Sequence, residues 1–275
     1  SALSDGETAY ALTLPPLNPT ERQQYDSWKA LSNALNLPLH FEVGAPNALE
    51  FSENMAASDR ILTTSVAEGF GMVYLESWLA GRPLIGRDLP EITADFVTSG
   101  LDLSSLAECI DIPQSWVPRH EVTEQIRTSY NRVLTAYQRP APSEAEFDAE
   151  LSALFANGLL DFARLSARLQ ASVVLLVKQD EGRRQVLRDL NPSLDTGSAM
   201  PDSTADKLVT QNAQTVRQAY GLKAAGQRLR TIYNTVHGCR RGTDELLADG
   251  FLAQGGATIL DAFLSLNRFH PLRVD

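Results

Sequence analysis

The sequence predicts an α/β protein with a Rossmann-like parallel sheet, flanking helices, a helical insertion and a helical C-terminal tail. Three observations lead to this fold class. Short apolar, β-branched runs alternate with helical patterns over residues 8–85, a glycine loop joins a strand to a helix near residue 70, and helical spacing replaces strand patterns from residue 140 onward. We therefore expect a Rossmann-like core over 1–139, an insertion over 140–205 and closing C-terminal helices over 206–275.

The first unit is a strand over residues 8–14, which two prolines end. A helix of about 16 residues follows, for which Thr20 is a suitable N-cap, and a second strand covers 38–43. Strand, helix and strand in this order predict parallel pairing and a right-handed crossover. A short helix over 47–57 leads to the next strand, at 60–65.

Residues 65–76 combine a strand end, a glycine loop and a helix start. Gly69-Phe70-Gly71 ends the strand, and residues 72–80 have helical spacing. Backbone N–H groups beside glycines can approach a phosphate closely, and a helix N-terminus adds about half a positive charge. The stretch therefore predicts an anion site, and Glu68 and Glu76 flank it.

The elements after this loop complete the expected sheet. A buried strand over 83–85 places the loops at 65–72 and 86–91 at the carboxyl ends of parallel strands, where ligands bind in open α/β sheets. Residues 106–112 are expected to form the last strand and 120–138 a helix. From residue 140 the pattern predicts helices over 144–157, 161–178 and 182–189, then long helices over 207–236 and a helix-rich tail in which Gly255-Gly256 is a turn.

Charge and composition exclude some classes of function. A net charge of −10 argues against nucleic-acid or anionic-membrane binding as the main activity, since both need a basic face. Cys109 and Cys239 are interpreted as free thiols in a reducing cytoplasm, with a disulfide as the alternative. No apolar run approaches the roughly 20 residues of a membrane span. The four histidines share no metal-ligand spacing, so no metal site is expected.

Four sub-motifs occur in order over about 35 residues, which is a specific signal. They are Ser58-Asp59-Arg-Ile-Leu-Thr-Thr-Ser65, Glu68-Gly-Phe-Gly with Glu76, Gly81-Arg-Pro-Leu84 and Leu89-Pro-Glu91-Ile92. This series resembles the donor-binding half of a glycosyltransferase of the two-Rossmann-domain (GT-B) fold, and most closely glycosyltransferase family 4, whose retaining enzymes carry an E-x7-E motif. The resemblance implies a hexosyltransferase that uses a UDP-, GDP- or ADP-linked sugar and no further cofactor. It also implies an N-terminal domain, absent here, that recognises the acceptor.

The resemblance assigns roles to the residues of the motif. Glu76 would accept the ribose hydroxyls, and Glu68, the catalytic candidate, would contact the transferred sugar and balance charge at the reacting centre. Gly69, Phe70, Gly71 and Met72 would offer backbone N–H groups to the diphosphate. The plain alternatives are a solvated surface Glu76, a capping Glu68 and a purely structural turn.

Two further residues complete the predicted donor site. Glu91 matches the Pro-Glu step of the family, although a glutamate in the first turn of a helix explains it equally well. Many relatives carry an Arg and a Lys after the first strand to neutralise the diphosphate, but the loop at 15–22 offers only Arg22. Either another cation such as Arg87 replaces them, or activity is impaired.

Two other functions remain as alternatives. A sugar-nucleotide epimerase or phosphorylase on a similar fold would need a different catalytic set, and the E-x7-E spacing disfavours it. A non-catalytic scaffold that kept the fold would use its helical parts as a partner surface, and the missing Lys favours it.

Overall fold

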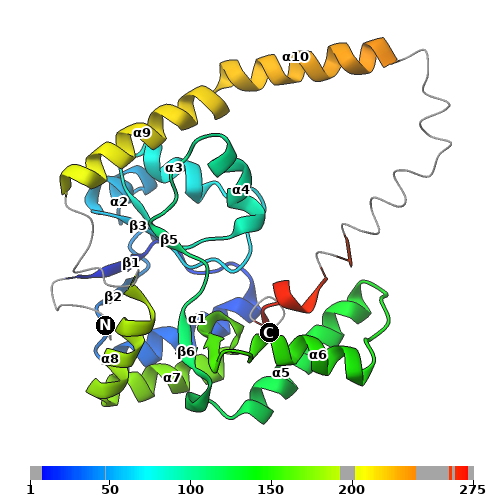
Figure 1. The fold of residues 1–275 in the computed structure, drawn as a ribbon. Helices are drawn as coiled ribbons and strands as arrows, with labels where there is room; N and C mark the ends of the chain where they lie inside the picture. Colours follow the sequence, from blue (N-terminus) through cyan, green and yellow to red (C-terminus); the bar gives the residue numbers. More distant parts are fainter. Residues whose placement is uncertain (1–7, 47, 193–201, 240–259, 262–263, 272–275) are drawn as a thin grey trace.

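The computed structural model describes residues 8–46, 48–192, 202–239, 260–261 and 264–271, and has an α/β architecture in which helices surround small open sheets (Figure 1). The strands are β1 (Tyr10–Leu12), β2 (Leu39–Phe41), β3 (Ile61–Thr63), β4 (Leu84–Arg87), β5 (Leu106–Ala107), β6 (Asp111–Pro113) and β7 (Leu159–Asp161). The helices are α1 (Pro19–Ala34), α2 (Phe51–Ala57), α3 (Val73–Leu79), α4 (Pro90–Thr98), α5 (Arg119–Ala136), α6 (Glu144–Leu154), α7 (Ala167–Gln179), α8 (Glu181–Leu190), α9 (Asp202–Tyr220) and α10 (Leu222–Cys239). Single 3₁₀ turns are η1 (Gln114–Trp116), η2 (Phe162–Arg164) and η4 (Leu266–Arg268).

Parallel pairing in the first part of the chain is confirmed. β1 pairs with β2 across α1, and β3, β4 and β5 form a second parallel sheet. Among the described strands these two sheets share no ladder, so the α/β class is established while a continuous Rossmann-like sheet stays a prediction. Most of these strands have only three residues, which is short for a strand and leaves few hydrogen bonds to join neighbours.

The expected strand over 106–112 is wrong as a single element. Its first part is β5 of the parallel sheet, while its end is β6, which pairs with β7 in an antiparallel ladder. At the start of β6 the Asn191 side chain holds Asp111 at both backbone groups, accepting from its N–H at 2.7 Å and donating to its carbonyl at 2.8 Å. The expected helix over 161–178 is also corrected. Asp161 ends β7, its carboxylate accepts the N–H of Ala163 to start η2, and α7 begins only at Ala167.

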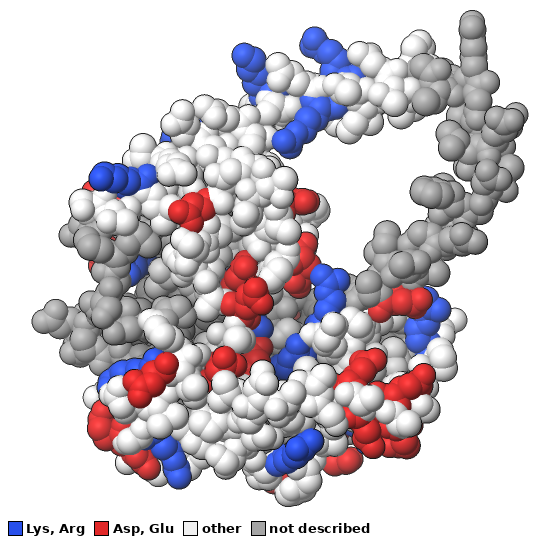
Figure 2. Space-filling model, in the orientation of Figure 1, with Lys and Arg blue, Asp and Glu red and all other residues white. Residues whose placement is uncertain are grey.

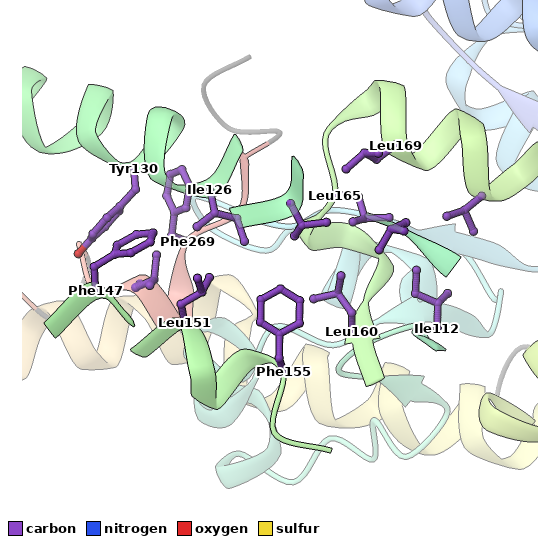
Figure 3. Close-up of a cluster of buried hydrophobic side chains, with 14 of the residues drawn as sticks. Ile112, Ile126, Tyr130, Phe147, Leu151, Phe155, Leu160, Leu165, Leu169 and Phe269 are labelled. Carbon is purple, nitrogen blue, oxygen red and sulfur yellow. The ribbon is translucent and has the colours of Figure 1, made fainter. Parts of the chain in front are cut away.

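Two hydrophobic clusters form the interior. The motif cluster joins α3, β4, α4 and α9, and its most buried side chains include Tyr74, Trp78 and Leu84. The second cluster joins β6, α5, α6, β7, α7 and the residues around η4, and Figure 3 shows Phe147, Phe155 and Phe269 within it. In its described part, the segment expected as a helical insertion over 140–205 contains α6, α7 and α8 and the short strand β7. The predicted boundary after residue 139 runs through the second cluster, and the three-part division stays a prediction.

The long helices expected over 207–236 are α9 and α10. α9 packs along α3, and Asn212 on α9 is fully buried, accepting from the N–H of Asp102 at 2.9 Å and donating to its carbonyl at 2.8 Å. α10 continues beyond α9 and projects from the body of the molecule (Figure 1). In the described part of the chain, no helix has both the length and the apolar character needed to cross a membrane. The predicted turn at residues 255–256 lies outside the described residues.

Candidate site at the carboxyl edge of β3 and β4

The loop at 64–72 and the loop after Arg87 meet at one edge of a parallel sheet, as predicted. β3 and β4 run in the same direction with Thr63 opposite Gly86, so both strands deliver their following loops to the same side. The hydroxyl of Tyr74, in the first turn of α3, donates to the carbonyl of Arg87 at 2.9 Å. This bond ties the helix after the first loop to the end of the neighbouring strand.

Gly71 is required by the shape of this loop. Its φ is +64°, and a Cβ there would lie 2.4 Å from the Ile92 Cγ2 and 3.0 Å from the Tyr74 Cδ2. Both the left-handed backbone and the absence of a side chain are therefore needed at this position. Gly69 differs, because a Cβ there would meet no atom within 4 Å. Only one of the two motif glycines is fixed by the fold itself.

The two motif glutamates have different surroundings. Glu68 is half-buried, and its Oε1 accepts a hydrogen bond from the Ser65 hydroxyl at 2.6 Å, which fixes the carboxylate on the loop. Glu76 is exposed on α3. The helix has only seven residues, so its dipole is smaller than the sequence argument assumed. The backbone N–H of Glu76 bonds to the Met72 carbonyl at 2.8 Å and is not free for a ligand.

Carboxylates dominate the electrostatics of this edge. Burial is the main cause that raises the pKa of Tyr74 to about 12, and the charges of Asp88, Glu68 and Glu91 act in the same direction. A hydrogen bond with Thr63 lowers this pKa, but by less. Tyr74 therefore stays a neutral hydrogen-bond donor throughout the ordinary pH range. A diphosphate at this edge would need a cation to offset the carboxylates.

Neither cation named from the sequence is free at the loop. Arg22 pairs with Asp26 on the same helix, α1, at 3.4 Å and with Glu42, which follows β2, at 3.6 Å. Arg87 donates to both oxygens of Asp161, at 3.2 Å and 2.7 Å. Its guanidinium thus points to the second cluster, although its backbone carbonyl belongs to the motif edge.

The Arg87–Asp161 pair is part of a buried polar group. The side chains are only 13% and 11% exposed, and His270 Nε2 lies 3.3 Å from Arg87 Nη2. Burial would raise the pKa of Asp161, but its contacts with His270 and Arg87 outweigh burial and hold that pKa well below its usual range. Burial raises the pKa of the nearby Cys109 thiol to about 11, and the charge of Asp111 adds to the rise. The free thiol of Cys109 therefore stays protonated and is a poor nucleophile.

A groove of about 450 Å³ adjoins the motif loop. The loop, α4 and the junction of α9 with α10 form its walls, and the lining residues are Gly69, Phe70, Glu91, Ile92, Asp95, Phe96, Thr98, Ser99, Tyr220 and Arg228. Phe70, one of the lining residues, is 86% exposed. The Phe96 and Tyr220 rings meet edge to face at 5.5 Å, and the Arg228 guanidinium lies 5.7 Å from the centre of the Tyr220 ring.

The structure brings only part of the predicted site together. Gly69, Phe70 and Glu91 line one groove, whereas Glu68, Gly71, Met72 and Glu76 are not among its lining residues. Arg228 was missed because it lies far along the chain, and nothing in the motif series points to it. Its only sequence signal is that α10 combines apolar spacing with basic residues. The described residues contain no group of three His, Cys, Asp or Glu side chains placed to hold a metal ion.

Comparison with known proteins gives no family assignment. No family model matches the sequence, and the chain has no significant match among curated proteins or solved structures. The resemblance to glycosyltransferases therefore depends on the motif series alone.

Proposed function

We propose that this chain binds a nucleotide sugar and serves as the donor-binding half of a retaining glycosyltransferase. The observation that carries the proposal is the position of the E-x7-E loop. It follows β3 at the carboxyl edge of a parallel sheet, next to the end of β4, from which the chain runs into α4 with Glu91 in its first turn, and Tyr74 bonds to the Arg87 carbonyl there. This is the edge at which open α/β sheets bind nucleotides.

Each residue has a distinct role in the proposal. Glu76 is exposed and can accept hydrogen bonds from ribose hydroxyls, while Glu68 is held by Ser65 and contacts the transferred sugar. The backbone of residues 69–72 lies along the diphosphate, and Gly71 sets its path. The groove beside the loop has the volume of a small-molecule site.

Arg228 is the cation that we assign to the diphosphate. It lines the groove next to Gly69 and Phe70, where its positive charge offsets the carboxylates of the edge. An arginine can bind two phosphate oxygens at once, which suits this role. The assignment replaces Arg22 and Arg87, which other carboxylates already bind.

A non-catalytic scaffold is the second candidate, and the same ion pairs favour it. With Arg22 and Arg87 occupied, the motif edge presents Glu68, Asp88 and Glu91 to any bound anion. Unless Arg228 compensates, this field repels a diphosphate. Such a protein would keep the fold without binding the donor.

Calorimetry with UDP, GDP and ADP, each free and linked to a sugar, tests the proposal. We expect Glu76→Ala to weaken binding of both free and sugar-linked nucleotide by about 1–3 kcal/mol, the usual loss of a charged hydrogen-bond partner. Glu68→Ala should spare the free nucleotide and weaken only the sugar-linked form, because its contact is with the sugar. Binding should persist in the presence of a chelator.

The control is Glu150→Ala, which removes an exposed carboxylate from α6 in the second cluster and should change neither ligand. Equal losses for Glu68→Ala and Glu76→Ala with free nucleotide would refute the division of roles. If no nucleotide or nucleotide sugar binds the wild-type chain, the scaffold is the better account.

A further inference from the structure

α10 is an 18-residue helix with an apolar face that the described part of the fold leaves uncovered. Leu222 is 94% exposed and Tyr233 67% exposed, and Leu229, Ile232 and Val236 are each at least half exposed. Within the described residues, the helix makes its main contact with α9. Monomeric proteins rarely leave so many large apolar side chains in water on one element, so this face has a use.

The apolar residues share one side of the helix. Positions 222, 225, 229, 232 and 236 recur at alternating spacings of three and four, which at 3.6 residues per turn puts them on a single stripe. Tyr233 lies at its edge. Lys223 and Arg230 are seven residues apart, so they lie on one side of the helix, about 120–140° around it from the centre of the stripe.

The charge of α10 is opposite to that of the chain as a whole. The helix carries Lys223, Arg228 and Arg230 and no acidic residue, in a chain with a net charge of −10. Figure 2 shows Lys and Arg side chains along α10 and no Asp or Glu on the face in view. The overall negative charge argued against binding to anionic membranes, but α10 is a basic helix that projects from the acidic body of the protein.

These properties distinguish between possible occupants. Two copies of α10 packed against each other would bring Arg228, which flanks the stripe, beside the seam with no carboxylate on the other helix to pair with it, so charge gives a pair of helices no support. A bilayer surface with anionic headgroups fits better. It takes up an apolar stripe of about this width, lets Tyr233 sit at the interface and offers negative charge to the basic side chains of the helix.

We propose that α10 lies in the plane of an anionic membrane surface, with its apolar stripe among the upper acyl chains and Lys223 and Arg230 at the headgroups. This site is independent of the proposed donor site, since neither residue lines the groove. Surface binding of this kind requires no membrane-spanning helix. It places the motif loop near the membrane, because Arg228 on the same helix lines the adjoining groove.

Co-sedimentation of the whole chain with vesicles tests this proposal. The vesicles contain phosphatidylcholine alone or phosphatidylcholine mixed with phosphatidylglycerol. We expect binding to the mixed vesicles, weakening as salt rises, and little binding to phosphatidylcholine. The double variants Leu229→Ser with Ile232→Ser, and Lys223→Glu with Arg230→Glu, should each lower the vesicle partition coefficient about tenfold or more.

Matched controls lie nearby. Lys207→Glu with Arg217→Glu makes the same charge change on exposed positions of α9, and Leu14→Ser with Leu17→Ser removes exposed apolar side chains after β1. Both controls should bind mixed vesicles nearly as the wild type does. Tyr233→Trp gives a second measurement that needs no loss of function, since its fluorescence should shift to shorter wavelength when mixed vesicles are added.

Three results would overturn the proposal. The first is equal binding to both vesicle types or to neither, and the second is the absence of a spectral shift for Tyr233→Trp. The third is a dimer in light scattering that the Leu229 and Ile232 substitutions dissociate while vesicle binding is absent, which would assign the stripe to a second copy. Loss of nucleotide binding alone would leave this inference intact, so its failure can be told apart from failure of the proposed function.

Discussion

Replacing Gly71 with alanine should destabilise the motif cluster, whereas the same change at Gly69 should not. At Gly71 the new Cβ would lie 2.4 Å from Ile92 Cγ2, 3.0 Å from Tyr74 Cδ2 and 3.3 Å from Phe96 Cε2. Ile92 is β-branched and stiff at χ1, and Phe96 is buried, so these neighbours have little room to move. The φ of +64° adds a second cost, because alanine in the left-handed region loses about 1–2 kcal/mol.

Overpacking of a core usually costs about 1–3 kcal/mol. Together with the backbone term, we expect Gly71→Ala to lower the free energy of unfolding by about 2–5 kcal/mol. Gly69→Ala meets no atom within 4 Å and should stay within about 0.5 kcal/mol of the wild type. Urea denaturation followed by tryptophan fluorescence measures the difference, because Trp78 is fully buried in the motif cluster. Equal midpoints for the two variants would refute the crowding argument.

Three further outcomes are expected. Asp161→Asn should lower the free energy of unfolding by about 3 kcal/mol at neutral pH, because it leaves Arg87 without its charge partner. The pKa of Asp161 is lowered in the folded state, so its stabilising contribution is present above its unfolded pKa of about 3.9 and disappears as the pH falls. The acid denaturation curves of variant and wild type should therefore converge at low pH. Asn212→Ala removes both hydrogen bonds to the Asp102 backbone and should cost about 1–3 kcal/mol in thermal or urea unfolding, with unchanged stability counting against the clamp. Arg228→Ala should weaken nucleoside diphosphate binding about tenfold in calorimetry and barely affect a nucleoside without phosphates, and equal effects on both would remove it from the proposed site.

Local patterns in the sequence predict the first part of the fold well. The spacing of Tyr25, Trp28 and Leu31 predicts a helix of about 16 residues, and α1 has 16. The glycine loop lies between β3 and α3 as expected. These features depend on periodicity and on turn residues, which act over a few positions and can be read from one chain.

The errors concern contacts between distant residues. The sequence pattern predicts Asp161 at the start of a helix. In the structure it ends β7, whose partner strand lies some 50 positions earlier, and its carboxylate binds Arg87, which belongs to β4 beside the motif cluster. Asn191 binds the backbone of Asp111 in β6 through two hydrogen bonds that no local pattern signals. Arg228 enters the groove only because α9 returns along α3. Pairings of this kind depend on how elements pack, and propensity carries no information about them.

The second cluster has a consequence for the order in which the chain can fold during synthesis. Its helices are complete when α8 ends at Leu190, but Leu264, Leu266 and Phe269 also belong to its interior. Tyr130 donates to the Leu264 carbonyl at 2.8 Å, and Arg164 donates to the Phe269 carbonyl at 2.8 Å. About 75 residues of translation separate the two events, which is roughly 4–15 s at the usual elongation rate.

During that interval the apolar surface awaiting these three side chains is exposed on a growing chain. Among the described residues, the last contribution to the motif cluster comes from α9, which ends at Tyr220, so these residues can pack without that delay. During synthesis the motif cluster is therefore packed while the second cluster is still incomplete. We expect chaperone binding and premature aggregation to involve mainly the second cluster.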